Sequence, residues 1–293
     1  MTQTFVAGNQ SALPWASHSL SVLVPAYNEV DNLAPTVDRL LRALSVTVED
    51  YEIIIVDDGS TDGTAAVADQ LAEQYPSVRA YHNSPNRGLG YCYRRGIELA
   101  QKGSFVYIPG DNTWPYRSFL DLFGNLGKAD IITSYSTNPE VRPAGRRIVS
   151  SGYTQTLNVL FGQRLRYFNG LTIYPLGFLQ ANPPTTSGFG FQAEVLLKAI
   201  DQGYSFLEVA IPIDERTAGG SKAVTAKNIA SVVKTVARTF WKLRAQRVVS
   251  YTGLVSRPST GFDLSAIDGD PNTWWSPGFL DQHGEYVDYL LPG

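Results

Sequence analysis

Short apolar strands alternate with amphipathic helices along the first half of this chain, and this alternation constrains the fold more than any other feature. Because strand–helix–strand units lay their strands parallel, the pattern predicts an α/β fold with a mostly parallel open sheet and helices on both faces. Asp62 is the expected N-cap of the second helix. The expected strands are 20–24, 52–57, 78–82, 104–108 and one beginning at 131, and the expected helices are 30–44, 63–74, 88–101 and 116–126.

The composition changes after residue 135. Five arginines and no acid follow Glu140 within residues 136–166, which predicts a basic helix with loops. Further elements are expected at 168–174 (strand), 190–202 (helix), 206–211 (strand), 216–222 (loop) and 225–246 (long basic helix).

Polar groups follow three of the expected strands, at the point where each strand ends. Ligands of open α/β sheets bind outside the carboxyl ends of the strands, so these groups predict one site for a nucleotide diphosphate and a metal ion. Each turn taken singly is also explained by helix capping or by backbone conformation. The residues at these three ends are Pro25, Tyr27, Glu29, Asp57, Asp58, Ser60, Gly110, Asp111 and Asn112.

The acids at these ends suit different parts of such a substrate. Asp57 can accept hydrogen bonds from a ribose or from a base N–H. Sugar transfer builds negative charge on the leaving phosphate, and Mg²⁺ or Mn²⁺ neutralises it while bound to carboxylates and phosphate oxygens. Asp111 stands beside Gly110, which leaves room for the diphosphate, and is the predicted metal ligand.

The segment from Arg216 to Lys222 is the candidate phosphate loop. Its two glycines give flexibility, Ser221 offers a hydroxyl, and Arg216 and Lys222 offer charges suited to phosphates. Such a loop can close over a diphosphate and exclude water, although a solvated surface loop has the same composition.

Gln192 and Glu194 begin the helix expected at 190–202. An acid there is favoured by the positive end of the helix, which is a structural role, and hydrogen bonding toward the acceptor is the alternative. The histidines, His18, His82 and His283, are scattered, and we assign them no role.

Bulk properties exclude several classes of protein. The net charge of −3 does not favour nucleic-acid binding. Cys92 is the single cysteine, which excludes internal disulfides and fits a reducing compartment. The start lacks a signal-peptide pattern and no segment approaches roughly 18 uninterrupted apolar residues. We therefore expect a cytoplasmic protein, at most peripheral on the inner face of the membrane.

Several motifs, in this order and spacing, resemble the family 2 inverting glycosyltransferases of the GT-A fold, over about residues 20–245. The later motifs resemble the dolichyl-phosphate mannose synthase branch of that family. The motifs are Val24-Pro25-Ala26-Tyr27-Asn28-Glu29, Val56-Asp57-Asp58-Gly59-Ser60-Thr61-Asp62-Gly63, Asn86-Arg87-Gly88, Phe189-Gly190-Phe191-Gln192-Ala193-Glu194 and Arg216-Thr217-Ala218-Gly219-Gly220-Ser221-Lys222.

The resemblance implies roles at the matching positions. Asp111 matches the last acid of the D-x-D metal motif, while Pro109 replaces the first acid, so the metal site is expected to be poorer in protein ligands. Thr113 and Asn169-Gly170 also depart from the family pattern. The implied nucleoside-binding residues are Pro25, Tyr27, Glu29, Asp57 and Ser60, the phosphate-loop residues are Arg216, Ser221 and Lys222, and the expected catalytic residues are Asp111, Arg216 and Lys222.

The expected reaction is metal-assisted sugar transfer from a UDP- or GDP-linked donor to a polyprenyl phosphate. A phosphate monoester is already anionic near neutral pH, so this acceptor needs cations and no strong base. The basic face of helix 225–246 is a candidate to hold it, and that helix suits peripheral membrane contact. The other candidates are five arginines, Arg142, Arg146, Arg147, Arg164 and Arg166. A soluble acceptor, or a non-catalytic nucleotide-sugar binder, are the alternatives.

Three parts are expected along the chain. Residues 1–19 form an irregular segment, residues 20–248 the catalytic domain, and residues 249–293 a tail. Part of the tail, Ala266-Ile267-Asp268-Gly269-Asp270-Pro271-Asn272-Thr273-Trp274-Trp275-Ser276, resembles the start of a discoidin-like domain. The tail is too short to bury the core of such a sandwich, so we expect no sugar binding from it.

Overall fold

The computed structural model describes residues 5–6, 18–186, 188, 190–214, 235–241, 279–280 and 286–287. The chain divides into two compact units, Met1–Gln246 and Arg247–Gly293. In the second unit the described residues are two short antiparallel strands, β9 (Phe279–Leu280) and β10 (Tyr286–Val287). The discoidin-like segment of the tail lies outside the described residues.

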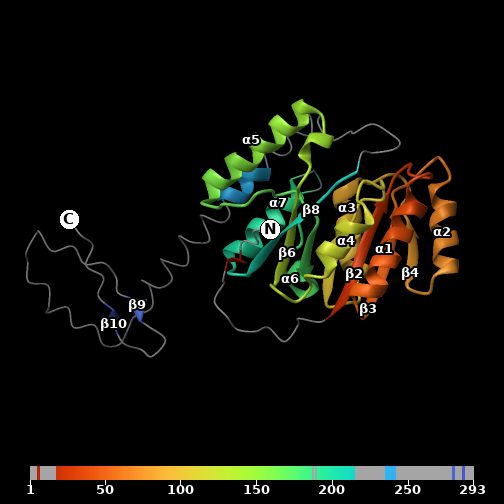
Figure 1. The fold of residues 1–293 in the computed structure, drawn as a ribbon, viewed down its shortest axis with the longest axis horizontal. Coiled ribbons are helices and arrows are strands. Elements are labelled where there is room, and N and C mark those ends of the chain that lie inside the picture. The colour runs from red at the N-terminus through yellow and green to blue at the C-terminus, as the bar shows by residue number, and fades with distance from the viewer. Residues whose placement is uncertain are drawn as a thin grey trace, which may run out of the picture. The chain divides into compact units, whose positions relative to one another are not determined.

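The first unit is built on a sheet of order β1-β8-β6-β7-β5-β2-β3-β4 (Figure 1). The run β5-β2-β3-β4 is parallel, as is the pair β6-β8. β7 runs antiparallel to β5 and β6, and β1 antiparallel to β8. The predicted α/β fold with a mostly parallel sheet is confirmed. The strands are β1 Phe5–Val6, β2 Ser19–Ala26, β3 Asp50–Asp57, β4 Val78–His82, β5 Ser104–Tyr107, β6 Ile131–Ser136, β7 Thr172–Pro175 and β8 Phe206–Ile211.

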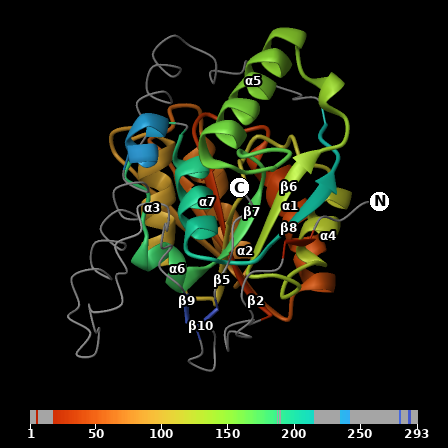
Figure 2. The same cartoon turned by 90° about the vertical axis from the view of Figure 1, so that its left-hand side faces the viewer.

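Helices cover both faces of this sheet (Figure 2). α1, α2 and α4 share one apolar core with Val22 and Val24, whereas α3, α6 and α7 share the other with Leu23. This alternation follows from the strand, in which successive side chains point to opposite faces. The helices are α1 Leu33–Thr47, α2 Thr64–Gln74, α3 Leu89–Leu99, α4 Tyr116–Phe123, η1 Pro139–Val141, α5 Ala144–Phe161, α6 Leu176–Ala181 and α7 Phe191–Asp201.

Three details differ from the expectations. The N-cap of α2 is Gly63, in a left-handed conformation (φ 95°), and not Asp62. The Asp62 carboxylate still accepts a hydrogen bond from the Thr64 backbone N–H at 3.0 Å, but Asp62 is the residue before the N-cap. The strand expected at 168–174 begins only at Thr172, and Phe5–Val6 forms an edge strand within the segment expected to be irregular.

α5 is the basic helix expected within residues 136–166, and it lies on the outer side of the unit (Figure 1). Leu157 enters the core, while Ile148 and Val159 are 73% and 83% exposed. Residues 235–241 are helical, and the Phe240 ring packs edge-on against Phe161. No helix in the part of the chain that the structure describes combines the length and apolar character needed to cross a membrane.

Candidate active site

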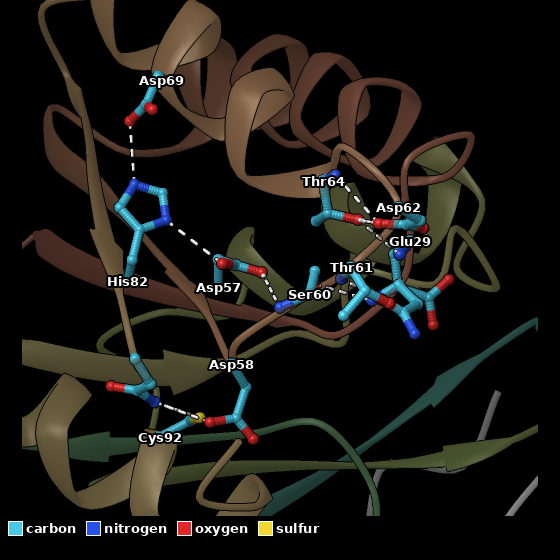
Figure 3. Close-up of polar contacts among 12 residues, drawn as sticks. Glu29, Asp57, Asp58, Ser60, Thr61, Asp62, Thr64, Asp69, His82 and Cys92 are labelled. Carbon is cyan, nitrogen blue, oxygen red and sulfur yellow. Dashed lines mark hydrogen bonds and ion pairs between the residues drawn. The ribbon is translucent and has the colours of Figure 1, made fainter. Parts of the chain in front are cut away.

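The turn after β2 is fastened to the turn after β3 by backbone-to-side-chain hydrogen bonds (Figure 3). The Asn28 backbone N–H donates to Ser60 Oγ at 2.9 Å, and the Thr61 N–H donates to Asn28 Oδ1 at 2.9 Å. Asn28 takes a positive φ of 55°, a conformation that asparagine tolerates better than most residues. The Glu29 N–H donates to Thr64 Oγ1 at 2.9 Å, so the turn after β2 is also bound to the first residue of α2.

Asp57 ends β3 with a buried carboxylate that has two partners. Its Oδ1 accepts from the Ser60 N–H at 3.2 Å, and its Oδ2 lies 3.3 Å from Nδ1 of His82. Asp57 is only 2% exposed, so its direction is set by these contacts. This arrangement suits an oriented acceptor for one ligand N–H.

Asp58 points the other way and organises the loop after β4. Its Oδ1 accepts from Asn83 Nδ2 at 2.8 Å and from the Arg87 N–H at 2.9 Å, and its Oδ2 accepts from the Gly88 N–H at 2.7 Å. Gly59 (φ 72°) must be glycine here, because a Cβ would lie 2.9 Å from the Asn86 nitrogen. The structure therefore gives Asp58 a structural task, and its predicted substrate contact stays a prediction.

The end of β5 meets the end of β2. The Gly110 N–H donates to the Pro25 carbonyl at 3.2 Å, and a Cβ on Gly110 would lie 3.2 Å from that oxygen. Asp111 follows, with Oδ1 accepting from the Thr113 hydroxyl at 2.7 Å. Asn112 has a positive φ of 54° and a buried Oδ1 with no hydrogen-bond partner. The ends of β2, β3 and β5 thus form one edge, as the sequence predicted.

The segment after β8 is attached to the Asp111 turn. The Asp214 N–H donates to the Thr113 carbonyl at 2.9 Å, and Arg39 bridges the Trp114 carbonyl (3.1 Å) and the Asp214 carboxylate (3.3 Å). Three predicted residues, Arg216, Ser221 and Lys222, lie outside the described residues. Their segment begins just after Asp214.

The start of α7 packs beside the end of β5, because the Phe191 ring lies 6.2 Å from the Tyr107 ring. Gln192 follows there and is half-buried. Glu194 is 3% exposed, receives the Lys198 ammonium at 2.7 Å and accepts from the Thr185 N–H and hydroxyl. Burial raises the pKa of Glu194, but these hydrogen bonds outweigh burial and hold it below its ordinary value.

Glu194 therefore has the structural role that its helix position favours, and its predicted substrate contact stays a prediction. Tyr27 is 40% exposed at the same edge as Asp57. Arg146 and Arg147 lie in the first turn of α5. No contact tests their predicted acceptor role.

The edge offers few ligands for a metal. Among the described residues, no group of three or more His, Cys, Asp or Glu side chains is placed to hold an ion. Asp111 supplies one carboxylate, and the unpartnered Oδ1 of Asn112 stands next to it in sequence. Oxygen donors of this kind fit Mg²⁺ or Mn²⁺, provided that the substrate completes the coordination.

A mostly parallel α/β sheet whose strand ends carry acids is typical of proteins that bind nucleotides at that edge. The model of the protein family described as "Glycosyl transferase family 2" matches residues 21–176, which are just over half of the 293 residues. The chain belongs to glycosyl transferase family 2 and is a glycosyltransferase.

Curated relatives agree with the branch that the motifs indicated. The chain is 28% identical over 261 residues to polyprenol monophosphomannose synthase of Mycolicibacterium smegmatis, covering 82% of this chain and 93% of the relative. It is 27% identical to undecaprenyl-phosphate mannosyltransferase of Micrococcus luteus, covering 68% and 85%. It is 26% identical to glycosyltransferase AglD of Haloferax volcanii, of which it spans only 40%, against 82% of this chain.

Solved structures share the fold. Glucosyl-3-phosphoglycerate synthase of Mycobacterium tuberculosis, in complex with phosphoglyceric acid, aligns with a TM-score of 0.60 at 20% identity, covering 75% of this chain and 79% of that one. The same enzyme with Mn²⁺, UDP-glucose and phosphoglyceric acid aligns with a TM-score of 0.58, also at 20% identity, covering 75% and 80%. At this identity the likeness establishes the fold alone.

Sequence reasoning missed the residues that orient the predicted ones. His82 was assigned no role, yet it contacts Asp57. The carboxyl ends of parallel strands meet at one edge of a sheet, and this rule also applies to His82, because His82 is the last residue of β4. Arg39 gave no comparable sign, because its partners, Trp114 and Asp214, lie 75 and 175 residues away.

Proposed function

We propose that this protein is an inverting glycosyltransferase that moves a sugar from a nucleotide diphosphate to a polyprenyl phosphate with the help of Mg²⁺ or Mn²⁺. The observation that carries the proposal is the joined edge of β2, β3 and β5, where Asp57 and Asp111 follow the two strands that flank β2. Ligands of open α/β sheets bind at such an edge.

The donor nucleoside is held at the β2–β3 end. Asp57 accepts a hydrogen bond from a base N–H, while Pro25, Tyr27, Glu29 and Ser60 line the nucleoside. UDP and GDP each carry a base N–H of this kind, so either fits. The clasp between Asn28 and the β3 turn keeps these groups in place before the donor arrives, which lowers the ordering cost of binding.

The diphosphate lies toward Asp111. A divalent cation bound there would neutralise charge on the leaving phosphate. Asp111 would hold it through one carboxylate, and Gly110 lets the chain before Asp111 approach the Pro25 carbonyl at the end of β2. Relatives in the fold are crystallised with Mn²⁺ and UDP-glucose, which supports this choice of ions.

Arg216, Ser221 and Lys222 supply further phosphate contacts in this proposal. Arg216 is two residues beyond Asp214 in the sequence. Asp214 is itself fastened to Thr113, two residues from Asp111. In this proposal the Arg216 guanidinium opposes the charge that develops on the diphosphate.

The acceptor side is basic. No acid occurs from residue 141 to residue 193, a segment that holds Arg142, Arg146, Arg147, Arg164 and Arg166. Arg147, Arg164 and Arg166 are exposed. The two bacterial relatives are named for polyprenol and undecaprenyl phosphate mannose transfer, which supports a lipid phosphate acceptor.

α5 is the surface that we propose meets the membrane at its inner face. Four apolar side chains on this helix are solvent-exposed, with Ile148 at 73% and Val159 at 83%, beside Val149 and Leu160. Exposed aliphatic residues on a helix that carries arginines and no acid fit an anionic lipid surface.

The reaction is tested with a labelled UDP- or GDP-sugar, Mn²⁺ and a polyprenyl phosphate in detergent. Asp111→Ala is expected to lose roughly a thousandfold in turnover. Asp121→Ala is the matched control, because Asp121 is a surface acid paired with Arg117 within one helix. Near-normal turnover of Asp111→Ala would remove Asp111 from the mechanism.

The same assay separates the alternatives. Transfer to phosphoglyceric acid or to a glycan, with none to lipid phosphate, would establish a soluble acceptor. Donor binding with neither transfer nor hydrolysis would leave a nucleotide-sugar binder.

The membrane surface is tested by sedimentation with vesicles containing anionic lipid. Replacing both Ile148 and Val159 by glutamate is expected to reduce binding at least tenfold. Val46→Glu is the control, because Val46 is 68% exposed on α1. Equal binding of the double variant and the wild type would exclude α5 as the docking surface.

A further inference from the structure

His82 lies directly opposite Asp57 in the pairing of β3 with β4 (Figure 3). Its imidazole stands between two carboxylates. Nδ1 is 3.3 Å from Asp57 Oδ2, and Nε2 is 3.0 Å from Asp69 Oδ1 on α2. The ring thus links the inner acid of the candidate nucleoside site to an acid on the protein surface.

Only the protonated ring satisfies both contacts. A neutral imidazole has one N–H, so one carboxylate would face a nitrogen lone pair. Burial lowers the pKa of His82, but the hydrogen bonds and charges of Asp69 and Asp57 outweigh burial and raise it above the ordinary value of 6.5. The geometry and the charges both favour the imidazolium near neutral pH.

A cationic side chain also lies near His82. Arg95 on α3 donates to the His82 carbonyl at 2.9 Å and also to Asn83 Oδ1. Its charge opposes protonation of the ring, but its hydrogen bonds are made with the loop. Asp57 and Asp69 are therefore the groups that set the charge of the ring.

We propose that His82 is a positioning residue whose protonated ring holds the Asp57 carboxylate as an oriented acceptor for the nucleobase, so that donor affinity depends on the His82 proton. This inference rests on the proposed function, because it takes Asp57 as the contact to the base. Ser60 fixes Oδ1 of that carboxylate and His82 fixes Oδ2, so the direction of the acceptor is set before the base N–H binds.

The direction of the pH effect follows from the raised pKa. The imidazolium is fully present below about pH 6.5, and the Asp57 contact is lost as pH rises through the folded-state pKa. The shorter contact, to Asp69, retains the last proton on Nε2. Nδ1 then presents a lone pair to Asp57 Oδ2, which releases the carboxylate from its bound direction.

Calorimetry of UDP-glucose and GDP-mannose binding between about pH 6 and pH 8.5 tests the proposal. A nucleotide sugar is the right probe, because its diphosphate is esterified at both ends and does not titrate in this range. Wild-type Kd is expected to rise at least about fivefold across the range. His82→Ala should bind at least about fivefold more weakly near pH 6 and show no pH dependence.

Two conservative variants separate positioning from general damage. His82→Asn offers an amide N–H toward Asp57 that does not titrate, so it should restore affinity and keep it constant with pH. Asp69→Asn removes one of the two charges without touching Asp57, so it should move the midpoint to lower pH. Asp38→Asn is the matched control, because the Asp38 and Asp69 side chains are 59% and 60% exposed.

Histidine ring NMR gives a readout that does not depend on turnover. The chain has three histidines, so His82→Asn identifies the His82 resonances. Because linkage is reciprocal, a fivefold preference of the donor for the imidazolium form raises the His82 pKa by about 0.7 when the site is saturated.

The possible failures differ. If the wild type binds neither nucleotide sugar at any pH, the proposed function fails and this inference fails with it. If the wild type binds with the same Kd at every pH, or if His82→Ala keeps the wild-type profile, the inference fails while the proposed function stands.

Discussion

Replacing Asp58 by alanine tests whether this acid organises the site or contacts the substrate. The carboxylate accepts three hydrogen bonds, from Asn83 Nδ2 and from the N–H groups of Arg87 and Gly88. Asp58 and Asn83 are 4% and 6% exposed, so water does not replace the bond to Asn83. In the alanine variant, the acceptor that remains for Asn83 Nδ2 among the described residues is the Cys92 sulfur at 3.4 Å, which is a weak acceptor.

The magnitude follows from these contacts. The buried donor of Asn83 costs about 1–3 kcal/mol when it loses its acceptor, and the two N–H groups, which are nearer to solvent, cost about 1 kcal/mol each. The expected loss is about 3–5 kcal/mol of unfolding free energy, a large share of the stability of a typical domain. At about 2–4 °C per kcal/mol, Tm falls by about 10 °C.

Thermal unfolding followed by circular dichroism, beside calorimetry of UDP-glucose and GDP-mannose, measures both roles. Asp38→Ala is the control, because Asp38 forms only an exposed pair with Arg42 at 3.5 Å, and its loss should cost no more than about 0.5 kcal/mol. If Asp58→Ala kept the wild-type Tm and lost donor binding, the structural assignment would be wrong and Asp58 would be a ligand contact.

Two other buried groups give simpler expectations. Burial, together with the charge of Asp58, raises the pKa of the Cys92 thiol to about 12. An alkylating reagent at about pH 8 should therefore modify Cys92 only after the protein is unfolded in urea. Rapid modification of the folded protein, measured by mass spectrometry, would contradict this expectation. Burial raises the pKa of Glu208 despite a hydrogen bond from the Arg166 N–H, so the folded state holds its proton more tightly and stability falls as pH rises through the window above 4.5. Glu208→Gln keeps the acceptor for Arg166 and should raise Tm at about pH 7 but not at pH 4; an equal shift at both pH values would show that the carboxylate charge is not the cause.

Much of the fold could be predicted, because strand and helix periodicities are local. The strands predicted at 78–82 and 206–211 have those bounds in the structure. The position of β7 could not be predicted in this way. An apolar pattern marks a strand but does not say which neighbours it pairs with, and β7 enters antiparallel between β5 and β6.

The part of the candidate site that follows from the direction of the strands could be predicted. Parallel strands bring their carboxyl ends to a single edge, so Asp57 and Asp111 could be placed together before the structure was known. The orientation of each side chain was not predictable. Asp57 and Asp58 are adjacent in sequence, yet one faces His82 and Ser60 while the other faces the 83–88 loop. Such choices depend on partners that arrive from other elements.

The two ends of the proposed donor site are built differently. At the nucleoside end, Asn28 clasps the β3 turn and His82 fixes Asp57, so this end is formed without the ligand. At the phosphate end, Pro109 stands where the family pattern has an acid, and the described residues hold no group of three or more His, Cys, Asp or Glu side chains placed to bind an ion. A cation there needs the oxygens of the diphosphate to complete its coordination. Nucleotide and metal should therefore bind as a pair, with the rigid end fixing the nucleoside and the nucleotide itself completing the metal site.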